Sequence, residues 1–248
     1  MPICGLTASR FGYSPQRHLT APPATVEQYT AFKKSLGITR SVLTHGLSYG
    51  HDCSSLKYFL KALCPSVTRG IAVIDESTPN MELDELHACG TRGIRLDLYK
   101  ESAMLDLEKQ TKMLQSYESR IQPWKWSLAF LQLNPENWGN LEKVIDSLPV
   151  PVVTDQHALL KGSSMLLEGV TDVMSQPGLS AVVSLLGTGN FWIKLSAPYR
   201  SSNQAPYYED MKDLVQLLVE KNPRRVLWRS DWFVVSSIRL VPQDWRSS

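Results

Sequence analysis

The sequence lacks the features that direct a chain to a membrane or to nucleic acid. No run of apolar residues approaches the ~18 that a membrane-spanning helix needs. The 26 basic and 24 acidic residues leave a formal net charge of only +2, and no basic stripe interleaved with aromatic residues occurs. We therefore expect neither a membrane nor a nucleic acid as a partner. A small anionic molecule suits this composition better, because a few well-placed arginines are enough to bind one.

Cysteine is also scarce, and its spacing excludes the usual metal and redox motifs. The four cysteines are Cys4, Cys53, Cys64 and Cys89, and no two of them form a C-x-x-C pair. We expect buried or inert thiols in a reducing compartment, with a disulfide or a metal role as the alternative. Residues 1–4 lack the basic region and the long apolar stretch of a signal peptide, so the cytoplasm is the expected location.

Short apolar runs, each ending at a polar residue, are the main structural signal. The seven runs cover residues 40–44, 70–74, 93–96, 126–131, 150–154, 191–195 and 226–230. The polar residues at their ends are His45, Asp75, Asp97, Gln132, Asp155, Ser196 and Asp231. Helices are expected between most of them, at residues 26–36, 54–63, 81–88, 103–117, 136–148, 179–186 and 207–221. This alternation is typical of an α/β fold with a parallel sheet.

The length of 248 residues suits one α/β barrel, and no linker divides the chain. We therefore predict a single domain over residues 1–248, with a (β/α)8 TIM-barrel-like fold. A barrel of eight units would need a further strand before the first helix. Only residues 3–6 could supply it, and Gly5 interrupts them. The chain also ends soon after Asp231. The expected barrel thus has a missing or degenerate first strand and a shortened C-terminus.

Residues 90–97 place two charged side chains on one strand. Because side chains alternate along a strand, Arg95 and Asp97 point to the same side, which in a barrel is the interior. An arginine there needs a partner, since an unpaired buried charge is very costly. The partner is either Asp97, in a structural ion pair, or a substrate carboxylate. The position of Arg95 near the strand end favours the substrate.

Residues 191–200 offer two further cations. Lys194 lies amid Trp192, Ile193 and Leu195, which is unusual for a lysine on the surface, and Arg200 follows in the loop. We predict that Lys194 or Arg200 faces a ligand, with a structural ion pair as the alternative.

Three strand ends carry residues that could transfer protons. Asp231 closes an apolar strand between two tryptophans, a position that suits a carboxylate to acid–base chemistry. His157 follows Asp155 closely at another strand end, where either side chain could bind a metal, transfer protons or serve the structure. His45 ends a third strand, where it contacts substrate or makes a structural hydrogen bond.

Four stretches together resemble the amidohydrolase superfamily, in the branch typified by 2-pyrone-4,6-dicarboxylate lactonase. They are residues 37–44 with 48–52, residues 92–95, residues 194–200 and residues 228–232. The most distinctive are Lys-Leu-Ser-Ala-Pro-Tyr-Arg at 194–200 and Leu-Trp-Arg-Ser-Asp-Trp at 227–232. The resemblance covers about residues 10–235 and is nearest to fungal members, which often act on aromatic or polyketide metabolites.

The resemblance implies a (β/α)8 barrel and a hydrolytic reaction. Asp231 matches the eighth-strand aspartate, which handles the proton of the attacking water. Arg95 and Arg200 match arginines that hold substrate carboxylates, and Ser48 and Tyr49 match the loop that lines the pocket. The implied reaction is the attack of water on a lactone or similar carbonyl of a small carboxylated aromatic, pyrone or polyketide metabolite, which would place this protein in secondary metabolism.

The chain departs from the family pattern where metals usually bind. Residues 1–10 contain no His-x-His pair, Gln156 separates His157 from Asp155, and Arg229 stands where glycine is usual. A catalytic zinc generally takes three protein ligands, and only His157 and Asp231 can be named. We therefore expect no metal, with zinc as the alternative. The alternative functions are a metal-dependent decarboxylase of aromatic acids and a non-catalytic or truncated amidohydrolase-like protein.

Overall fold

The computed structural model describes residues 3–4, 10–17, 20 and 24–232. These residues form one parallel sheet of eight strands in the order β1 to β8. The strands are β1 (Ile3–Cys4), β2 (Ser41–His45), β3 (Thr68–Ala72), β4 (Thr91–Arg95), β5 (Ser127–Phe130), β6 (Val152–Thr154), β7 (Phe191–Leu195) and β8 (Val226–Trp228). The predicted α/β fold is confirmed.

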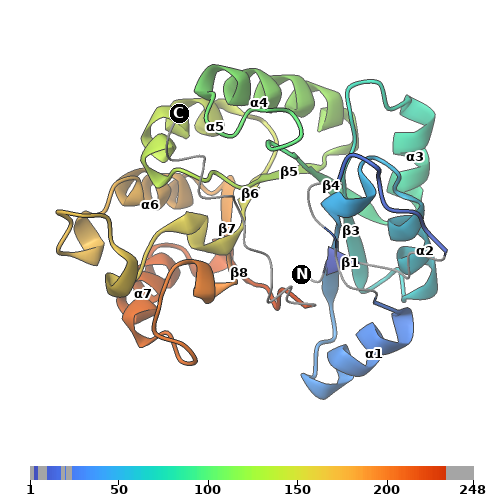
Figure 1. Cartoon of the computed structure of the whole chain (residues 1–248). Coiled ribbons are helices and arrows are strands. Elements are labelled where there is room, and N and C mark those ends of the chain that lie inside the picture. The colour runs from blue at the N-terminus through green and yellow to red at the C-terminus, as the bar shows by residue number, and fades with distance from the viewer. Residues whose placement is uncertain (1–2, 5–9, 18–19, 21–23, 233–248) are drawn as a thin grey trace.

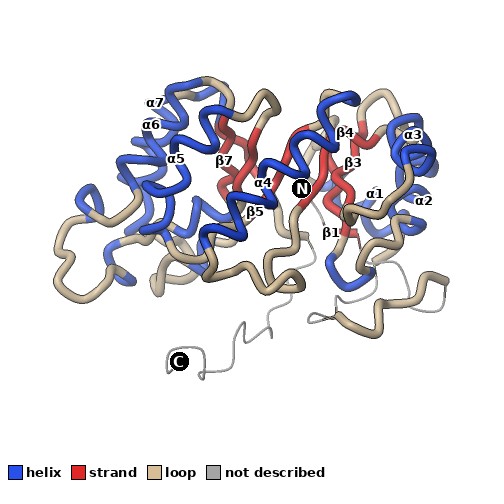
Figure 2. Tube along the Cα trace, turned by 90° about the horizontal axis from the view of Figure 1, so that it is seen from above, coloured by secondary structure: helices blue, strands red, loops and turns tan. Residues whose placement is uncertain are grey.

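Seven α-helices cover the outside of the curled sheet (Figure 1), and the view from above shows them flanking the strands (Figure 2). They are α1 (Val26–Ser35), α2 (Ser54–Ala62), α3 (Asn80–Ala88), α4 (Leu107–Ile121), α5 (Trp138–Ser147), α6 (Leu179–Thr188) and α7 (Lys212–Lys221). Within the described residues no helix is long and apolar enough to cross a membrane.

The first strand is as short as the sequence predicts. β1 has two residues, which pair with the end of β2 at Ile3↔Thr44 and Cys4↔His45. Among the described residues no backbone pairing joins β8 to β1, so the sheet is curled but open. Trp232 bridges this seam, since its ring lies 5.3 Å from that of Tyr29 and 5.4 Å from that of Phe32, both on α1. The predicted shortening of the C-terminus concerns residues 233–248, which lie outside the described residues.

Alternation along the strands divides the apolar residues into two sets. One large set joins the outward faces of the strands to the helices. A small second set lies inside the curled sheet, formed by Ile71, Ala129 and Val153 with Val42, Trp192 and Leu227 around them. Two residues after Val153, Trp192 and Leu227 stand Asp155, Lys194 and Arg229, of which Asp155 and Arg229 lie one residue beyond the ends of β6 and β8. The charged side chains therefore form a layer next to the apolar one, at the carboxyl ends of the strands.

Several predicted boundaries were wrong. The helix expected at residues 207–221 is α7, which starts only at Lys212, and the strand expected at residues 70–74 is β3, which covers Thr68–Ala72. The helix expected at residues 103–117 is α4, which starts at Leu107 because the Asp106 side chain accepts a hydrogen bond from the Lys109 N–H and caps it. The last strand ends at Trp228 rather than at residue 230. By contrast, the strand predicted at residues 191–195 is found with those bounds.

Candidate active site

Asp155 lies at the centre of the charged layer and faces three cations. Its carboxylate is 2.7 Å from Lys194 Nζ, 2.9 Å from Arg229 Nη1 and 3.9 Å from Arg95 Nη2. The residue is only 2% exposed. Burial alone would raise the pKa of this carboxyl group, but the charges of Arg229, Lys194 and Arg95 hold the pKa well below its usual range. Asp155 is therefore a permanent anion at the centre of the site.

Arg229 extends this cluster to Asp231. Its Nε lies 2.9 Å from Asp231 Oδ1, and the Tyr199 hydroxyl donates to Asp231 Oδ2 at 3.3 Å. Burial would lower the pKa of Arg229, but the carboxylates of Asp155 and Asp231 raise it above its usual value. The strand ends of β4, β6, β7 and β8 thus bring together three cations and two carboxylates. Among these five groups one positive charge is in excess; Asp97, which is less buried, is a further carboxylate whose charge acts on Arg95.

The excess of positive charge influences the pKa values of the other two cations, Lys194 and Arg95. Burial is the largest influence on Lys194 and on Arg95, and it lowers the pKa of each. The charge of Asp155 opposes this effect in both, whereas the charge of Arg229 reinforces it. Buried cations that repel one another are stabilised by an added anion, so the cluster is suited to bind one.

Arg200 and Tyr199 stand beside the cluster in the turn Pro198–Arg200. The Arg200 guanidinium carbon lies 5.6 Å from the centre of the Tyr199 ring. Burial and the charge of Asp231 raise the pKa of Tyr199, so its hydroxyl is a hydrogen-bond donor at neutral pH. The Lys161 ammonium donates to the backbone carbonyl of Arg200 at 2.7 Å. The structure therefore connects Arg200 to Asp231 through Tyr199.

His157 is buried by an unusual turn. Gln156, His157, Ala158 and Leu159 all have φ between 55° and 57°, a left-handed conformation that costs residues with a Cβ roughly 1–2 kcal/mol each. Burial lowers the pKa of His157 to about 4, although a hydrogen bond with the backbone of Ser196 opposes this. The ring is therefore neutral at pH 7. The turn explains how His157 stays inside although Gln156 separates it from Asp155.

His45, Ser48 and Tyr49 form a separate buried group at the end of β2. The His45 ring lies 5.5 Å from that of Tyr49, which in turn lies 5.0 Å from that of Tyr13. Burial lowers the pKa of His45 to about 4. The sequence placed these residues with the cations in one pocket, whereas the described contacts of the charged cluster come from β4, β6, β7 and β8.

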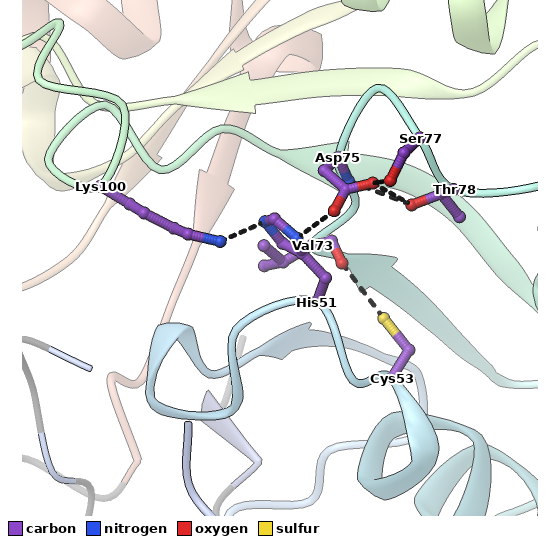
Figure 3. A network of polar contacts seen from close by, with 7 residues as sticks. All are labelled: His51, Cys53, Val73, Asp75, Ser77, Thr78 and Lys100. Carbon is purple, nitrogen blue, oxygen red and sulfur yellow. Dashed lines mark hydrogen bonds and ion pairs between the residues drawn. The ribbon is translucent and has the colours of Figure 1, made fainter. Parts of the chain in front are cut away.

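A second polar network lies at the ends of β2, β3 and β4 (Figure 3). His51 Nδ1 lies 2.6 Å from Asp75 Oδ2, and Lys100 Nζ lies 3.2 Å from His51 Nε2. Asp75 also accepts from the hydroxyls of Ser77 and Thr78 at 2.8 and 3.0 Å. Burial would raise the pKa of Asp75, but these contacts lower it to about 2. The network holds the loops that follow the three strands together.

A cavity of about 410 Å³ borders the cluster at Lys194 and at Ser230. It lies near the seam, at the amino ends of β2 and β3 and beside α1 and β8, whereas the charged cluster lies at the carboxyl ends of the strands. Its other lining residues include Tyr29, Arg40, Arg69 and Trp228. This volume is within the range of small-molecule sites.

The sequence prediction missed the central role of Arg229 and Asp155. Arg229 was noted only as a departure from the family pattern, and Asp155 was considered, with His157, as a metal ligand, a proton carrier or a structural residue, but not as the partner of the three cations. A signal was present, since Leu227, Arg229 and Asp231 follow the two-residue period of one strand face. The predicted interior position of Arg95 agrees with the structure, but its nearest ion-pair partner is Asp155 rather than Asp97.

The cluster does not have the donors that zinc requires. Among the described residues no three His, Cys, Asp or Glu side chains gather where they could hold a metal ion. The two carboxylates of the cluster already face Lys194 and the guanidinium of Arg229. A divalent cation at this place would be repelled by three buried positive charges. We therefore derive no step through a metal.

Comparison with known proteins agrees with this architecture. The family model described as Amidohydrolase matches residues 2–247. The 4-sulfomuconolactone hydrolase of Hydrogenophaga intermedia is 26% identical over 231 residues, which cover 90% of this chain and 70% of the relative. The 2-pyrone-4,6-dicarboxylate hydrolase of Comamonas testosteroni is 27% identical over 235 residues, which cover 90% and 72%.

A solved structure shows the same fold. It is a probable 2-pyrone-4,6-dicarboxylic acid hydrolase from Acinetobacter baumannii with citric acid bound. It aligns with a TM-score of 0.73 at 21% sequence identity, over 97% of this chain and 86% of that one. The family match, the relatives and the fold confirm the predicted resemblance, and the chain belongs to the amidohydrolase family, in the branch that includes 2-pyrone-4,6-dicarboxylate hydrolases.

Proposed function

We propose that this protein hydrolyses the lactone of a small anionic substrate. The observation that carries the proposal is the buried cluster in which three cations outnumber two carboxylates. An anionic group of the substrate restores the balance of charge. The proposal is supported by two relatives that are hydrolases of a sulfomuconolactone and of a pyrone dicarboxylate, both of which are anionic lactones.

Arg95, Lys194 and Arg200 supply the donors for the anionic group. Arg95 lies 3.9 Å from Asp155, a distance of an ion pair rather than of a hydrogen bond, and a guanidinium has five N–H donors. A carboxylate suits such a fork because it accepts two parallel hydrogen bonds. The substrate class is then a small carboxylated aromatic, pyrone or polyketide metabolite. The separate group at the end of β2, His45, Ser48 and Tyr49, would line the pocket from a different strand.

Asp231 acts as the general base. Water attacks the lactone carbonyl while one of its protons passes to the Asp231 carboxylate. The negative charge that develops on the carbonyl oxygen is stabilised by the neighbouring cations. The ring C–O bond then breaks, and the leaving oxygen takes the proton back from Asp231. His157 is neutral because its pKa is low, so it does not act as an acid. It contributes through hydrogen bonds that orient neighbouring groups of the site.

The test is an assay of the purified chain against pyrone and aryl lactones, each with and without a carboxylate. Asp231→Asn should lower the rate by roughly 10³-fold or more, since it removes the base. Asp146→Asn, an exposed change on α5, is the matched control and should retain the wild-type rate. Lactones with a carboxylate should react faster than those without one. Equal rates for the wild type and Asp231→Asn would refute the proposal.

The same panel tests the alternatives. Aromatic acids with added zinc or manganese are included, because decarboxylation of such acids in barrel enzymes uses a metal. Metal-dependent release of carbon dioxide would favour the decarboxylase. The donor set of the charged cluster argues against this result.

A further inference from the structure

Arg229 holds two carboxylates of the cluster at once, through two different nitrogens. Nη1 lies 2.9 Å from Asp155 Oδ2, and Nε lies 2.9 Å from Asp231 Oδ1. The side chain is only 1% exposed. A planar guanidinium that is fixed at two edges defines the relative orientation of both carboxylates, which a single ammonium group does not do.

Apart from the ion pair with Arg229, few described contacts hold the Asp231 carboxylate in place. Its backbone has φ of 51°, so it leaves the line of β8 and needs side-chain contacts to fix its direction. Its second oxygen, Oδ2, accepts from Tyr199 at 3.3 Å, a long hydrogen bond. The shorter contact, with Arg229, is therefore the stronger constraint on the carboxylate. Asp155 in turn keeps Arg229 in place through the ion pair at 2.9 Å.

We propose that Arg229 is a positioning residue, which fixes Asp231 Oδ1 so that Oδ2 is directed toward the reacting water. The inference rests on the proposed function, because it concerns the orientation of the proposed base. Arg229 does not bind the substrate: its Nε and Nη1 are engaged by carboxylates of the chain itself. It follows that a substitution that keeps the charge of Arg229 but loses its planar fork reduces kcat and leaves KM nearly unchanged.

The first test uses Arg229→Lys and Arg229→Met. Misplacement of a catalytic group by about 1 Å costs on the order of 10²-fold, so kcat should fall by about that factor in both variants. In Arg229→Lys, which keeps the positive charge of the cluster, KM should change by less than about threefold, because Arg95, Lys194 and Arg200 remain to bind the substrate. In Arg229→Met the excess of positive charge is lost, so KM should rise as well as kcat fall. The matched control is Arg225→Met. Arg225 stacks on Trp192 at 4.0 Å, at the opposite end of the barrel, and its loss should leave kcat unchanged.

The second test is chemical rescue. Arg229→Ala opens a space for a free guanidinium ion, which should restore at least about a tenth of the lost kcat, whereas ammonium at the same concentration should not. Circular dichroism checks that the variant folds. If Arg229→Ala does not fold, the kcat and KM of Arg229→Lys and Arg229→Met decide the question.

Three results would overturn the inference. One is a rise in KM at unchanged kcat, which would make Arg229 a substrate ligand. Another is rescue of kcat by ammonium to the same extent as by guanidinium, which would show that only the positive charge of Arg229 matters. If the wild type hydrolyses no lactone, the proposed function fails, and crystal structures then test the inference separately. In Arg229→Met the contact between Tyr199 and Asp231 Oδ2 should be lost, and its retention would refute the positioning role.

Discussion

At the scale of single residues, Asp155 determines how the buried charges of the site are arranged, although it has no step of its own in the proposed reaction. Its carboxylate is the common partner of Arg95, Lys194 and Arg229. Sequence reasoning placed the cations inside the barrel, because a charged residue within an apolar strand has few other positions. It did not identify their partner, because the partner depends on which strand ends face one another across the interior.

The change Asp155→Asn should therefore destabilise the fold. Removal of one member of a buried ion pair costs about 3–5 kcal/mol, since the remaining charges lose their compensation. Chemical denaturation with urea measures this loss. The exposed variant Asp146→Asn should stay within about 0.5 kcal/mol of the wild type. A stability of Asp155→Asn equal to that of the control would show that the cations do not depend on Asp155.

The same carboxylate predicts a dependence on pH. Because the folded-state pKa of Asp155 is depressed, its contribution to stability is present above the ordinary aspartate pKa of about 3.9. That contribution is lost as the pH falls from there toward the lower folded-state pKa. Acid denaturation followed by circular dichroism should therefore be less steep below about pH 4 in Asp155→Asn than in the wild type.

His157 predicts a second effect, at higher pH. Burial lowers its pKa to about 4, whereas an unfolded histidine has a pKa of about 6.5. Between these values the unfolded chain binds more protons, so stability declines as the pH falls from 6.5 toward 4. At pH 5 this one residue should cost about 2 kcal/mol relative to pH 7. In His157→Gln the difference in urea stability between pH 7 and pH 5 should shrink by that amount, and an unchanged difference would contradict a buried neutral ring.

At the scale of elements, the ends of helices and strands decide where the sequence prediction succeeds. β7 has its predicted bounds because apolar residues surround Lys194 from Phe191 to Leu195. α4 begins a turn later than predicted, since apolar periodicity continues upstream of the residue that caps the helix. The left-handed turn Gln156–Leu159 contains no glycine, the residue that usually marks a positive φ in a sequence, so the turn could be found only in the tertiary structure.

The cap of α4 is open to a direct test. Asp106→Ala removes the side chain that accepts from the Lys109 N–H at 2.9 Å, and the loss of such a cap costs about 1 kcal/mol. Urea denaturation measures the difference. Asp106→Asn should retain most of the stability, because the amide oxygen can still accept the hydrogen bond. Equal losses in both variants would show that charge rather than capping is responsible.

At the scale of the whole molecule, the seam between β8 and β1, across which the described residues make no backbone pairing, distinguishes this sheet from a closed barrel. The sequence indicated it through the poor first strand. It did not indicate how the seam is held, because that depends on one aromatic residue placed just after Asp231. Trp232 packs on Tyr29 and Phe32 of α1 and so joins the last strand to the first helix. The same contact fixes the segment that carries the proposed base.

Trp232→Ala should therefore affect both stability and activity. Trp232 is partly buried against the core, so the loss of its side chain should cost about 2–3 kcal/mol, somewhat less than that of a fully buried tryptophan. Trp228→Ala is a matched control, since Trp228 is 62% exposed and its removal should cost within about 0.5 kcal/mol. Urea denaturation separates the two variants. If they lost equal stability, the aromatic contact with α1 would not be what holds the seam, and Asp231 would owe its position to Arg229 and Tyr199 alone.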